Sequence, residues 1–362
     1  MTKTFLIMAG GTGGHVYPAL ATARKLQEQG HDVVWLGSVD SFEERVVAQN
    51  DIPFFGLSIR GLRGKGVVTL LGAPIKLVRA LMQALRVIRN VEPACVLGMG
   101  GFASGPGGLA AKMLGKPLVI HEQNAVAGMT NKLLAKVATK VFEAFPNSFS
   151  QLANVECIGN PVRSEIVELF HARTLTDKPA IDARKTRVLI VGGSLGALKL
   201  NQVIPEALAL LPEELRPEVC HQTGKGKFDE TAKSYRDKAL VVDVKEYIED
   251  MAEAYAWADL VICRAGALTV SELCAAGVGA ILVPYPHAVD DHQTKNAQTM
   301  VEAGAGWLLS QEELSPNSLA EMLKPLLAKK ERISRLARAA LKLAKPDAAE
   351  RLARECGRLA HV

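Results

Sequence analysis

A glycine-rich turn near the start of the chain carries the first side chains that could do chemistry. Four of the six residues in Gly10–His15 are glycine, and the other two are Thr12 and His15. Glycine permits positive φ angles and lets an anion approach backbone N–H groups closely. Histidine, with an ordinary pKa of about 6.5, can transfer protons at neutral pH. The turn therefore predicts an anion site at whose edge His15 acts as a base, contacts a phosphate or only caps a helix.

Three later segments place glycine or polar residues directly after an apolar run. They are the polar quartet His121–Asn124, the turn Gly192–Ala197 with Ser194 in the place of Thr12, and the turn Arg264–Glu272 that opens a helix. In open α/β sheets, ligands bind outside the carboxyl ends of the strands. Two glycine turns in separate halves of the chain therefore favour a ligand with more than one anionic or polar part.

Other chemistries are less well supported. The glycine spacing differs from the Gly-x-Gly-x-x-Gly pattern of dinucleotide enzymes, although Asp40 could take the place of their ribose-binding acid. No Gly-x-x-x-x-Gly-Lys-Thr/Ser motif indicates nucleotide hydrolysis. His287, Asp290, Asp291 and His292 form a cluster, but no further ligand residues accompany it, so we expect neither a metal nor a cofactor.

Apolar strands alternate with helices along the chain, and this order must position the candidate residues. The expected strands include Phe5–Met8, Val33–Leu36, Ala94–Leu97, Pro117–Ile120, Val188–Val191, Leu260–Cys263 and Ala280–Pro284. The expected helices include Pro18–Gln29, Phe42–Gln49 and Leu109–Leu114. Continuous apolar strands between helices are typical of parallel sheets covered on both faces.

This alternation of apolar strands and helices occurs twice, with a break over Phe170–Arg187. We predict an α/β fold of two Rossmann-like, doubly wound parallel-sheet domains that face each other across a cleft. The expected domains are 1–162 and 163–342, and the C-terminal helix 343–362 is expected to pack back on the first domain.

Composition narrows the class of protein. The chain has 362 residues, of which 48% are hydrophobic and 22% charged, as in a globular protein. A net charge of +5 suits anionic substrates but is too small to indicate nucleic acid binding. The six cysteines form no C-x-x-C pair, and the apolar run before the first glycine is too short for a signal peptide. These features predict a cytoplasmic protein with reduced thiols.

The segment 67–89 is the one candidate for contact with a membrane. On a helical wheel Leu77, Val78, Leu81, Leu85 and Ile88 share a face, and beside it lie Lys76, Arg79, Arg86 and Arg89. A basic amphipathic helix can lie on an anionic lipid surface. The alternative is a core-facing helix with a solvated basic edge.

Together these motifs resemble the MurG family of bacterial N-acetylglucosaminyltransferases, which convert lipid I to lipid II in peptidoglycan biosynthesis. The motifs that match, in order along nearly the whole chain, are Gly10–His15, Gly98–Gly101, Ser104–Gly108, His121–Asn124, Gly159–Arg163, Gly192–Ser194, Gly266–Glu272 and Asp291–Gln293. The resemblance implies the GT-B architecture and an inverting transfer of GlcNAc from UDP-GlcNAc to the 4-hydroxyl of MurNAc. It also implies a peripheral location on the cytoplasmic face of the inner membrane, where lipid I lies.

The resemblance implies a role for each matching residue. For the donor, it implies uracil near Ile248 and Arg163, ribose hydroxyls on Glu272, and diphosphate at Ser194 and the helix opening Ala267, Leu268, Thr269, Val270 and Ser271. The GlcNAc hydroxyls would contact Gln293 and Asn124, and the acceptor diphosphate would contact Thr12, Gly13 and Gly14. His15 would deprotonate or orient the attacking hydroxyl. Two alternatives remain open: a UDP-GlcNAc epimerase on the same architecture, and a nicotinamide-dependent oxidoreductase.

Overall fold

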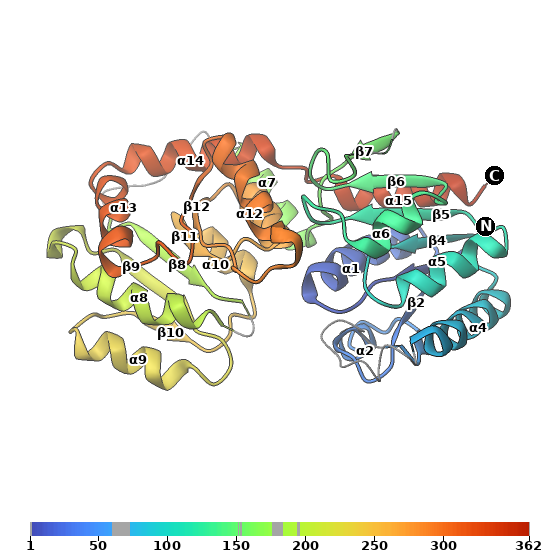
Figure 1. Ribbon diagram of the computed structural model, residues 1–362. Coiled ribbons are helices and arrows are strands. Elements are labelled where there is room, and N and C mark those ends of the chain that lie inside the picture. The colour runs from blue at the N-terminus through green and yellow to red at the C-terminus, as the bar shows by residue number, and fades with distance from the viewer. Residues whose placement is uncertain are drawn as a thin grey trace. The chain divides into compact units, whose positions relative to one another are not determined.

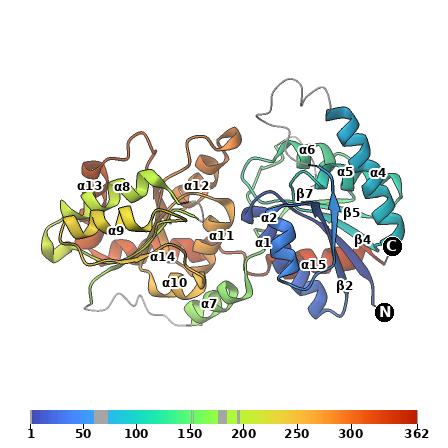
Figure 2. The same ribbon diagram turned by 90° about the horizontal axis from the view of Figure 1, so that it is seen from below.

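The protein forms two compact units, which we describe one at a time. The computed structural model describes residues 2–59, 73–150, 152, 154–175, 184–193 and 196–361. The first unit comprises Met1–Arg163 with Lys345–Val362, and the second comprises Ser164–Ala344. Ribbon views of both are given in Figures 1 and 2.

A parallel sheet forms the centre of the first unit, with strand order β3-β2-β1-β4-β5-β6-β7 in its described part. These strands are β1 (Thr4–Met8), β2 (Asp32–Ser38), β3 (Phe54–Leu57), β4 (Cys95–Gly98), β5 (Leu118–Glu122), β6 (Lys140–Glu143) and β7 (Val155–Cys157). The order reverses direction between β1 and β4, which pair with Phe5 opposite Cys95 and Met8 opposite Gly98. A crevice at the carboxyl ends of β1 and β4 is the position where such sheets bind ligands.

Alternation along β1 explains why helices must cover both faces of this sheet. Phe5 and Ile7 belong to a core cluster with residues of helices α1 and α15, whereas Leu6 and Met8 belong to a second cluster with residues of α4 and α5. All four side chains are buried, so neither face of β1 can be left to water. The helices are α1 (Gly13–Glu28), α2 (Phe42–Ala48), α4 (Ala73–Val91), α5 (Ser104–Met113), α6 (Met129–Ala135) and α15 (Ala348–Leu359). The last of these packs against α1 and β4 (Figure 1).

The second unit repeats the plan with the order β10-β9-β8-β11-β12-β13, and all described pairs are parallel. Its strands are β8 (Arg187–Val191), β9 (Glu218–Gln222), β10 (Asp243–Lys245), β11 (Leu260–Cys263), β12 (Gly279–Leu282) and β13 (Gly306–Leu308). Its helices are α7 (Ser164–Leu175), α8 (Leu198–Ala209), α9 (Phe228–Asp237), α10 (Met251–Trp257), α11 (Ala267–Ala276), α12 (His292–Glu302), α13 (Pro316–Ala328) and α14 (Lys330–Leu343), with 3-10 turns η1 (Glu213–Leu215) and η2 (Val289–Asp291).

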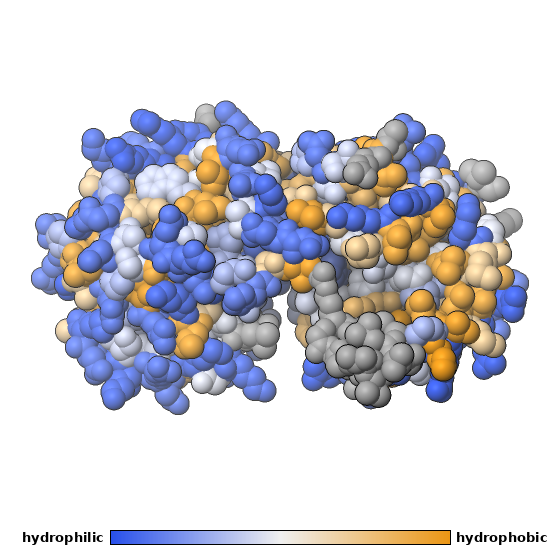
Figure 3. Space-filling view, viewed as in Figure 1, coloured by the Kyte–Doolittle hydropathy of each residue, from blue (hydrophilic) through white to orange (hydrophobic). Residues whose placement is uncertain are grey.

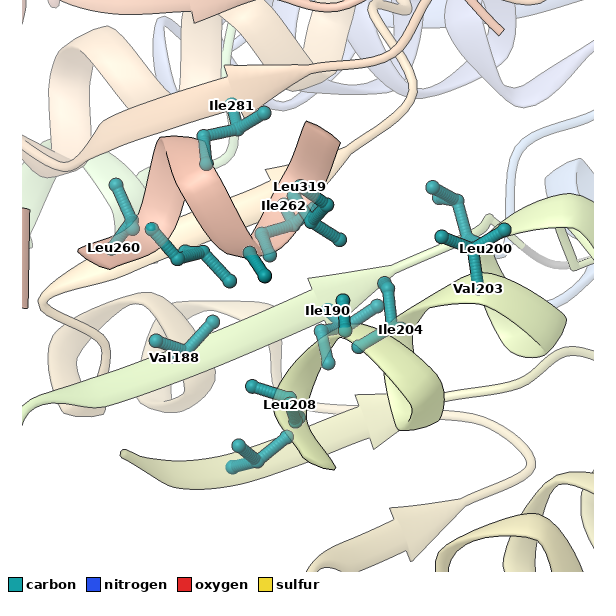
Figure 4. Close-up of a cluster of buried hydrophobic side chains, with 14 of the residues drawn as sticks. Val188, Ile190, Leu200, Val203, Ile204, Leu208, Leu260, Ile262, Ile281 and Leu319 are labelled. Carbon is teal, nitrogen blue, oxygen red and sulfur yellow. The ribbon is translucent and has the colours of Figure 1, made fainter. Parts of the chain in front are cut away.

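Aliphatic side chains hold this second sheet to its helices. Figure 4 shows Ile190 of β8 beside Ile204 of α8, and Ile262 of β11 beside Leu319 of α13. These residues are fully buried, and burial of each such side chain contributes about 1.5–3 kcal/mol. The core thereby fixes the carboxyl ends of β8 and β11, from which the candidate loops extend.

The predicted fold class is confirmed, but three boundaries were wrong. Helix α1 begins at Gly13 and α5 at Ser104, each five residues before its predicted start. In both cases the first helical turn contains two glycines, which are typical of loops. The predicted break at Phe170–Arg187 also begins too early, because Phe170–Leu175 belongs to helix α7.

Candidate functional site

In the first unit, two glycine turns meet at the carboxyl ends of β1 and β4. A Cβ on Gly101 would lie only 2.7 Å from the Gly10 nitrogen and carbonyl oxygen, so the two backbones are in direct contact. Gly11, Gly100 and Gly101 all have φ between 90° and 94°, in the left-handed region that favours glycine. Backbone conformation therefore favours glycine at all three positions, and close approach requires it at Gly101 as well.

Helix α1 presents its amino end at this position. Thr12 is the N-cap residue, and its hydroxyl makes no capping hydrogen bond to the helix. The first N–H groups of a helix have no acceptor inside the helix, and the helix dipole favours an anion there. Thr12, Gly13 and Gly14 are thus placed as an anion site requires, but the N–H of Gly11 donates to the Glu43 carboxylate at 3.2 Å.

The predicted base, His15, lies in the first turn of α1 and is fixed by a chain of hydrogen bonds. Its Nδ1 lies 2.7 Å from the Gln123 Oε1, and the Gln123 Nε2 lies 3.0 Å from the His121 Nδ1. The His121 Nε2 lies 2.9 Å from the carbonyl oxygen of Gly159. Burial lowers the pKa of His121 to about 4, so its ring is neutral at physiological pH. The polar residues at the end of β5 therefore reach His15.

The neighbouring Glu122 supports a loop. Its buried carboxylate accepts hydrogen bonds from the Asn124 and Gly128 N–H groups and from the Asn131 amide. The Asn124 side chain also donates to Glu122, at 3.2 Å. Asn124 is therefore rigidly placed at the end of β5. Its predicted contact with a sugar stays a prediction.

The second unit has an equivalent switch point between β8 and β11. Gly196 there has a φ of 70°, and a Cβ would lie 2.0 Å from the Thr223 carbonyl oxygen. That carbonyl accepts from Asn201 of α8, whose Oδ1 contacts the buried His221. The glycine turn after β8 is thereby held against β9. Ser194 lies outside the described residues.

Helix α11 follows β11, the strand that pairs with β8. Gly266 is its N-cap, so Ala267, Leu268 and Thr269 contribute the first N–H groups, which suit a diphosphate. The side chain of Val270 is buried, and the Ser271 hydroxyl donates to the Ala267 carbonyl oxygen. Val270 therefore packs in the core, and Ser271 makes its hydrogen bond within the helix.

Glu272 lies in the second turn of α11, too far along the helix to cap its amino end. Its carboxylate is buried and accepts a hydrogen bond from the Tyr255 hydroxyl at 3.3 Å. A helix-capping role is therefore excluded by its position.

The remaining predicted donor residues are spread over both units. Ile248 is buried in the segment before α10, and the Gln293 Oε1 of α12 accepts from the Tyr285 N–H at 2.9 Å. Arg163 belongs to the first unit, where its guanidinium lies 6.0 Å from the centre of the Tyr17 ring.

The His and Asp side chains of the cluster near His292 make hydrogen bonds within their own segment. The His292 Nδ1 lies 2.7 Å from the Val289 carbonyl oxygen, and the Asp291 carboxylate accepts from the Thr294 hydroxyl. No group of three His, Cys, Asp or Glu side chains in the described ranges is arranged to hold a metal ion.

Sequence reasoning missed two residues of the first unit. Gln123 was noted only as part of a polar quartet, and Glu43 was not singled out at all. Both contacts bridge segments that are distant in sequence, Gln123 with His15 and Glu43 with Gly11. Only the tertiary fold reveals them.

Comparisons with known proteins agree with this arrangement. The crystal structure of MurG from Acinetobacter baumannii has a TM-score of 0.83 and 38% identity, covering 98% of this chain and 99% of that one. A UDP-GlcNAc 2-epimerase from Neisseria meningitidis, at 13% identity and a TM-score of 0.68, shares the fold alone. Two Rossmann-like units, together with the likeness to MurG, place the chain in the GT-B class of glycosyltransferases.

Sequence comparison identifies the family. Residues 5–143 match the N-terminal domain of glycosyltransferase family 28, and residues 187–352 match its C-terminal domain. The UDP-N-acetylglucosamine–N-acetylmuramyl-(pentapeptide) pyrophosphoryl-undecaprenol N-acetylglucosamine transferase of Marinobacter nauticus is 55% identical over 98% of this chain and 97% of its own length. The chain therefore belongs to glycosyltransferase family 28 and, within it, to the MurG family.

Proposed function

We propose that the protein transfers GlcNAc from UDP-GlcNAc to the 4-hydroxyl of MurNAc in undecaprenyl-diphospho-MurNAc-pentapeptide (lipid I), which gives lipid II. The observation that carries this proposal is the 55% identity to the named transferase, which extends over both units. A relative that shared only the donor-binding unit would support the donor alone.

The second unit binds UDP-GlcNAc in this proposal. The amino end of α11, at Ala267–Thr269, and the turn that contains Ser194 receive the diphosphate. The Ile248 backbone meets the uracil, with Arg163 near the base. Glu272 accepts from the ribose hydroxyls, and the Gln293 amide contacts GlcNAc together with Asn124. Negative charge develops on the departing UDP, and N–H groups aimed at it stabilise the transition state.

The first unit binds the acceptor. Its diphosphate lies at the amino end of α1, near Thr12, Gly13 and Gly14. His15 takes the proton from the 4-hydroxyl as that oxygen bonds to the anomeric carbon of GlcNAc, while the bond from that carbon to UDP breaks. Attack from the face opposite UDP inverts the anomeric carbon, so an α-linked donor gives a β(1→4) product.

An exposed apolar surface on the first unit supports a membrane location. Eight large side chains on the adjacent helices α4, α5 and α6 are between 45% and 75% exposed: Ile75, Leu77, Val78, Met82, Leu109, Met113, Met129 and Leu133. Figure 3 shows hydrophobic side chains gathered over α4 and α5. Single exposed apolar residues are ordinary, but a continuous group of this kind marks an interaction site.

The apolar face predicted for the helix that forms α4 is only partly buried. Ile88 is buried and Leu81 and Leu85 pack on the core, whereas Leu77 and Val78 are more than half exposed. Helix α4 therefore uses one side for the core and another for the surface. Residues 67–72 of the predicted segment lie outside the described residues.

Charge favours an anionic bilayer as the partner of this surface. Lys76, Arg79, Arg86 and Arg89 of α4 are exposed, as are Lys112 of α5, Lys132 of α6 and Lys136 directly after α6. Each basic residue near an anionic leaflet contributes about 1 kcal/mol. No helix in the described part of the chain is long and apolar enough to cross a membrane. We infer peripheral attachment to the cytoplasmic leaflet, where lipid I is available.

A charge-neutralised variant tests the attachment. Replacing Lys76, Arg79, Arg86 and Arg89 with glutamine should reduce binding to vesicles that contain anionic lipid and leave UDP binding unchanged. The matched control replaces one lysine and three arginines that are also exposed, on the second unit: Lys329, Arg332, Arg335 and Arg338. Equal vesicle binding by both variants would refute the assignment of this surface.

Product analysis tests the reaction itself. Incubation with UDP-GlcNAc and a lipid I analogue should give a product heavier by one GlcNAc, with a β(1→4) linkage. An epimerised sugar nucleotide formed without acceptor would instead support the epimerase alternative.

A further inference from the structure

Beyond the residues assigned above, Gln123 and His121 form a buried chain that ends on the ring of His15. Both side chains are completely buried, whereas His15 is half-buried at the edge of the glycine turn. The contacts run from His15 Nδ1 to Gln123 Oε1, from Gln123 Nε2 to His121 Nδ1, and from His121 Nε2 to the Gly159 carbonyl oxygen. A buried chain of this length needs a definite direction of donation at every link.

Two backbone carbonyl groups set that direction. The Gly159 oxygen can only accept, so the His121 Nε2 carries the proton, and a neutral ring then leaves His121 Nδ1 as an acceptor. The Gln123 Nε2 lies 3.1 Å from the carbonyl oxygen of His121, which again can only accept. The NH2 end of the Gln123 amide therefore faces His121, and its oxygen faces His15.

The consequence falls on His15. An amide oxygen has no proton to give, so at 2.7 Å the His15 Nδ1 must be the donor. A neutral imidazole has one N–H group, and when Nδ1 carries it the lone pair lies on Nε2. We propose, on the basis of the proposed function, that Gln123 and His121 are positioning residues that hold His15 as its Nδ1–H tautomer, so that Nε2 is the atom that takes the acceptor's proton.

Two further features support this assignment. Burial keeps the His121 ring neutral, with its pKa lowered to about 4, so the chain holds its direction through the pH range in which His15 would work. The ring is also confined by Gly100, because a Cβ there would lie 3.0 Å from both Cε1 and Nδ1 of His15. Gln123 thus selects the tautomer of a ring that Gly100 already confines. The Gln123 backbone is itself anchored, since its carbonyl oxygen accepts from the Asn160 amide at 3.0 Å.

The test combines a spectroscopic readout with kinetics. Long-range 1H–15N NMR of the full chain, labelled at histidine, should show His15 protonated at Nδ1 and unprotonated at Nε2. Gln123→Met removes the acceptor at similar size, so we expect a mixture of tautomers, a fall in kcat of about 10–100-fold and an unchanged KM for UDP-GlcNAc.

The matched control is Thr22→Val. Thr22 is buried in α1, the helix that also carries His15, and its hydroxyl donates to the Pro18 carbonyl oxygen at 3.0 Å. We expect this variant to lose stability and to keep both the His15 tautomer and kcat within about twofold of the wild-type values.

The outcomes separate this inference from the proposed function. A wild-type His15 protonated at Nε2 would overturn the inference even if transfer to lipid I occurs. A Gln123→Met protein with unchanged kcat would overturn it as well. Absence of transfer by the wild-type chain would contradict the proposed function, while the NMR spectrum would still decide the tautomer.

Discussion

Gly100→Ala is the substitution whose effect on His15 the structure defines most closely. Gly100 has a φ of 94°, so an alanine there adopts a left-handed conformation at a cost of about 1–2 kcal/mol. For a unit of this size, that cost lowers Tm by about 2–8 °C. The new Cβ would also lie 3.0 Å from the His15 Cε1 and Nδ1, which is closer than the ordinary contact distance of about 3.5–4.0 Å.

The His15 ring must therefore move by about 0.5–1 Å away from that contact. Because its Nδ1 is already bonded to Gln123 at 2.7 Å, such a movement disturbs both the bond and the position of Nε2. A misplacement of about 1 Å can cost about 100-fold in rate, so we expect kcat to fall by about 10–100-fold. KM for UDP-GlcNAc should stay the same, because neither Gly100 nor His15 belongs to the proposed donor contacts.

Gly30→Ala provides the control for backbone strain. Gly30 belongs to the same unit and has a φ of 82°, but a Cβ there would meet no atom within 4 Å. Thermal unfolding and steady-state kinetics of both variants separate the two effects. We expect similar losses of Tm and a fall in kcat only for Gly100→Ala. Equal kcat values in the two variants would refute the expected contact between the alanine side chain at position 100 and the His15 ring.

Three other predictions concern stability. Burial lowers the pKa of His121 to about 4 and that of His221 to about 3, so below pH 6.5 the unfolded chain takes up protons that the folded chain does not. Between pH 6.5 and 5 the free energy of unfolding should therefore fall by about 1.1 kcal/mol per pH unit for each histidine. Urea titrations of His221→Gln should show a smaller slope. The His221 Nδ1 lies 2.8 Å from the Tyr235 hydroxyl, and Tyr235→Phe removes this hydrogen-bond partner. We expect a loss of about 1–3 kcal/mol in the free energy of unfolding measured with urea. A loss below about 0.5 kcal/mol would contradict the hydrogen bond between these two side chains. Asp259→Asn weakens the paired hydrogen bonds to Arg184 at 2.7 and 2.9 Å and should also lower the free energy of unfolding by about 1–3 kcal/mol. The control is Glu321→Gln, which removes an exposed ion pair with Lys324 and should cost less than about 1 kcal/mol by the same measurement.

The sequence predicted the fold class because its signals are local. Apolar runs such as Phe5–Met8 and Val188–Val191 each lead into a glycine turn, and a strand followed by such a turn and a helix is a short-range pattern. Helix starts were harder. The predicted start of α1 was Pro18, directly after the glycine-rich turn, whereas the helix begins at Gly13 and contains the proline. A ligand-binding helix end needs glycine more than it needs high helix propensity.

The candidate site could be predicted as a set of positions but not as a network. His15 was identified from its place beside glycines, which is visible in the chain. Its contact with Gln123 joins residues 108 positions apart, and the direction of donation depends on the Gly159 carbonyl, which no sequence pattern reveals. Glu272 shows the converse: its type suggested binding, while its burial and its bond with Tyr255 appear only in the fold.

The most direct test of the central claim is UDP release from UDP-GlcNAc, measured with and without a lipid I analogue. We predict that release depends on the acceptor and that the amount of UDP equals the amount of disaccharide product. UDP release at the same rate without acceptor, or tight binding of UDP with no release in either condition, would contradict the proposed transfer to lipid I.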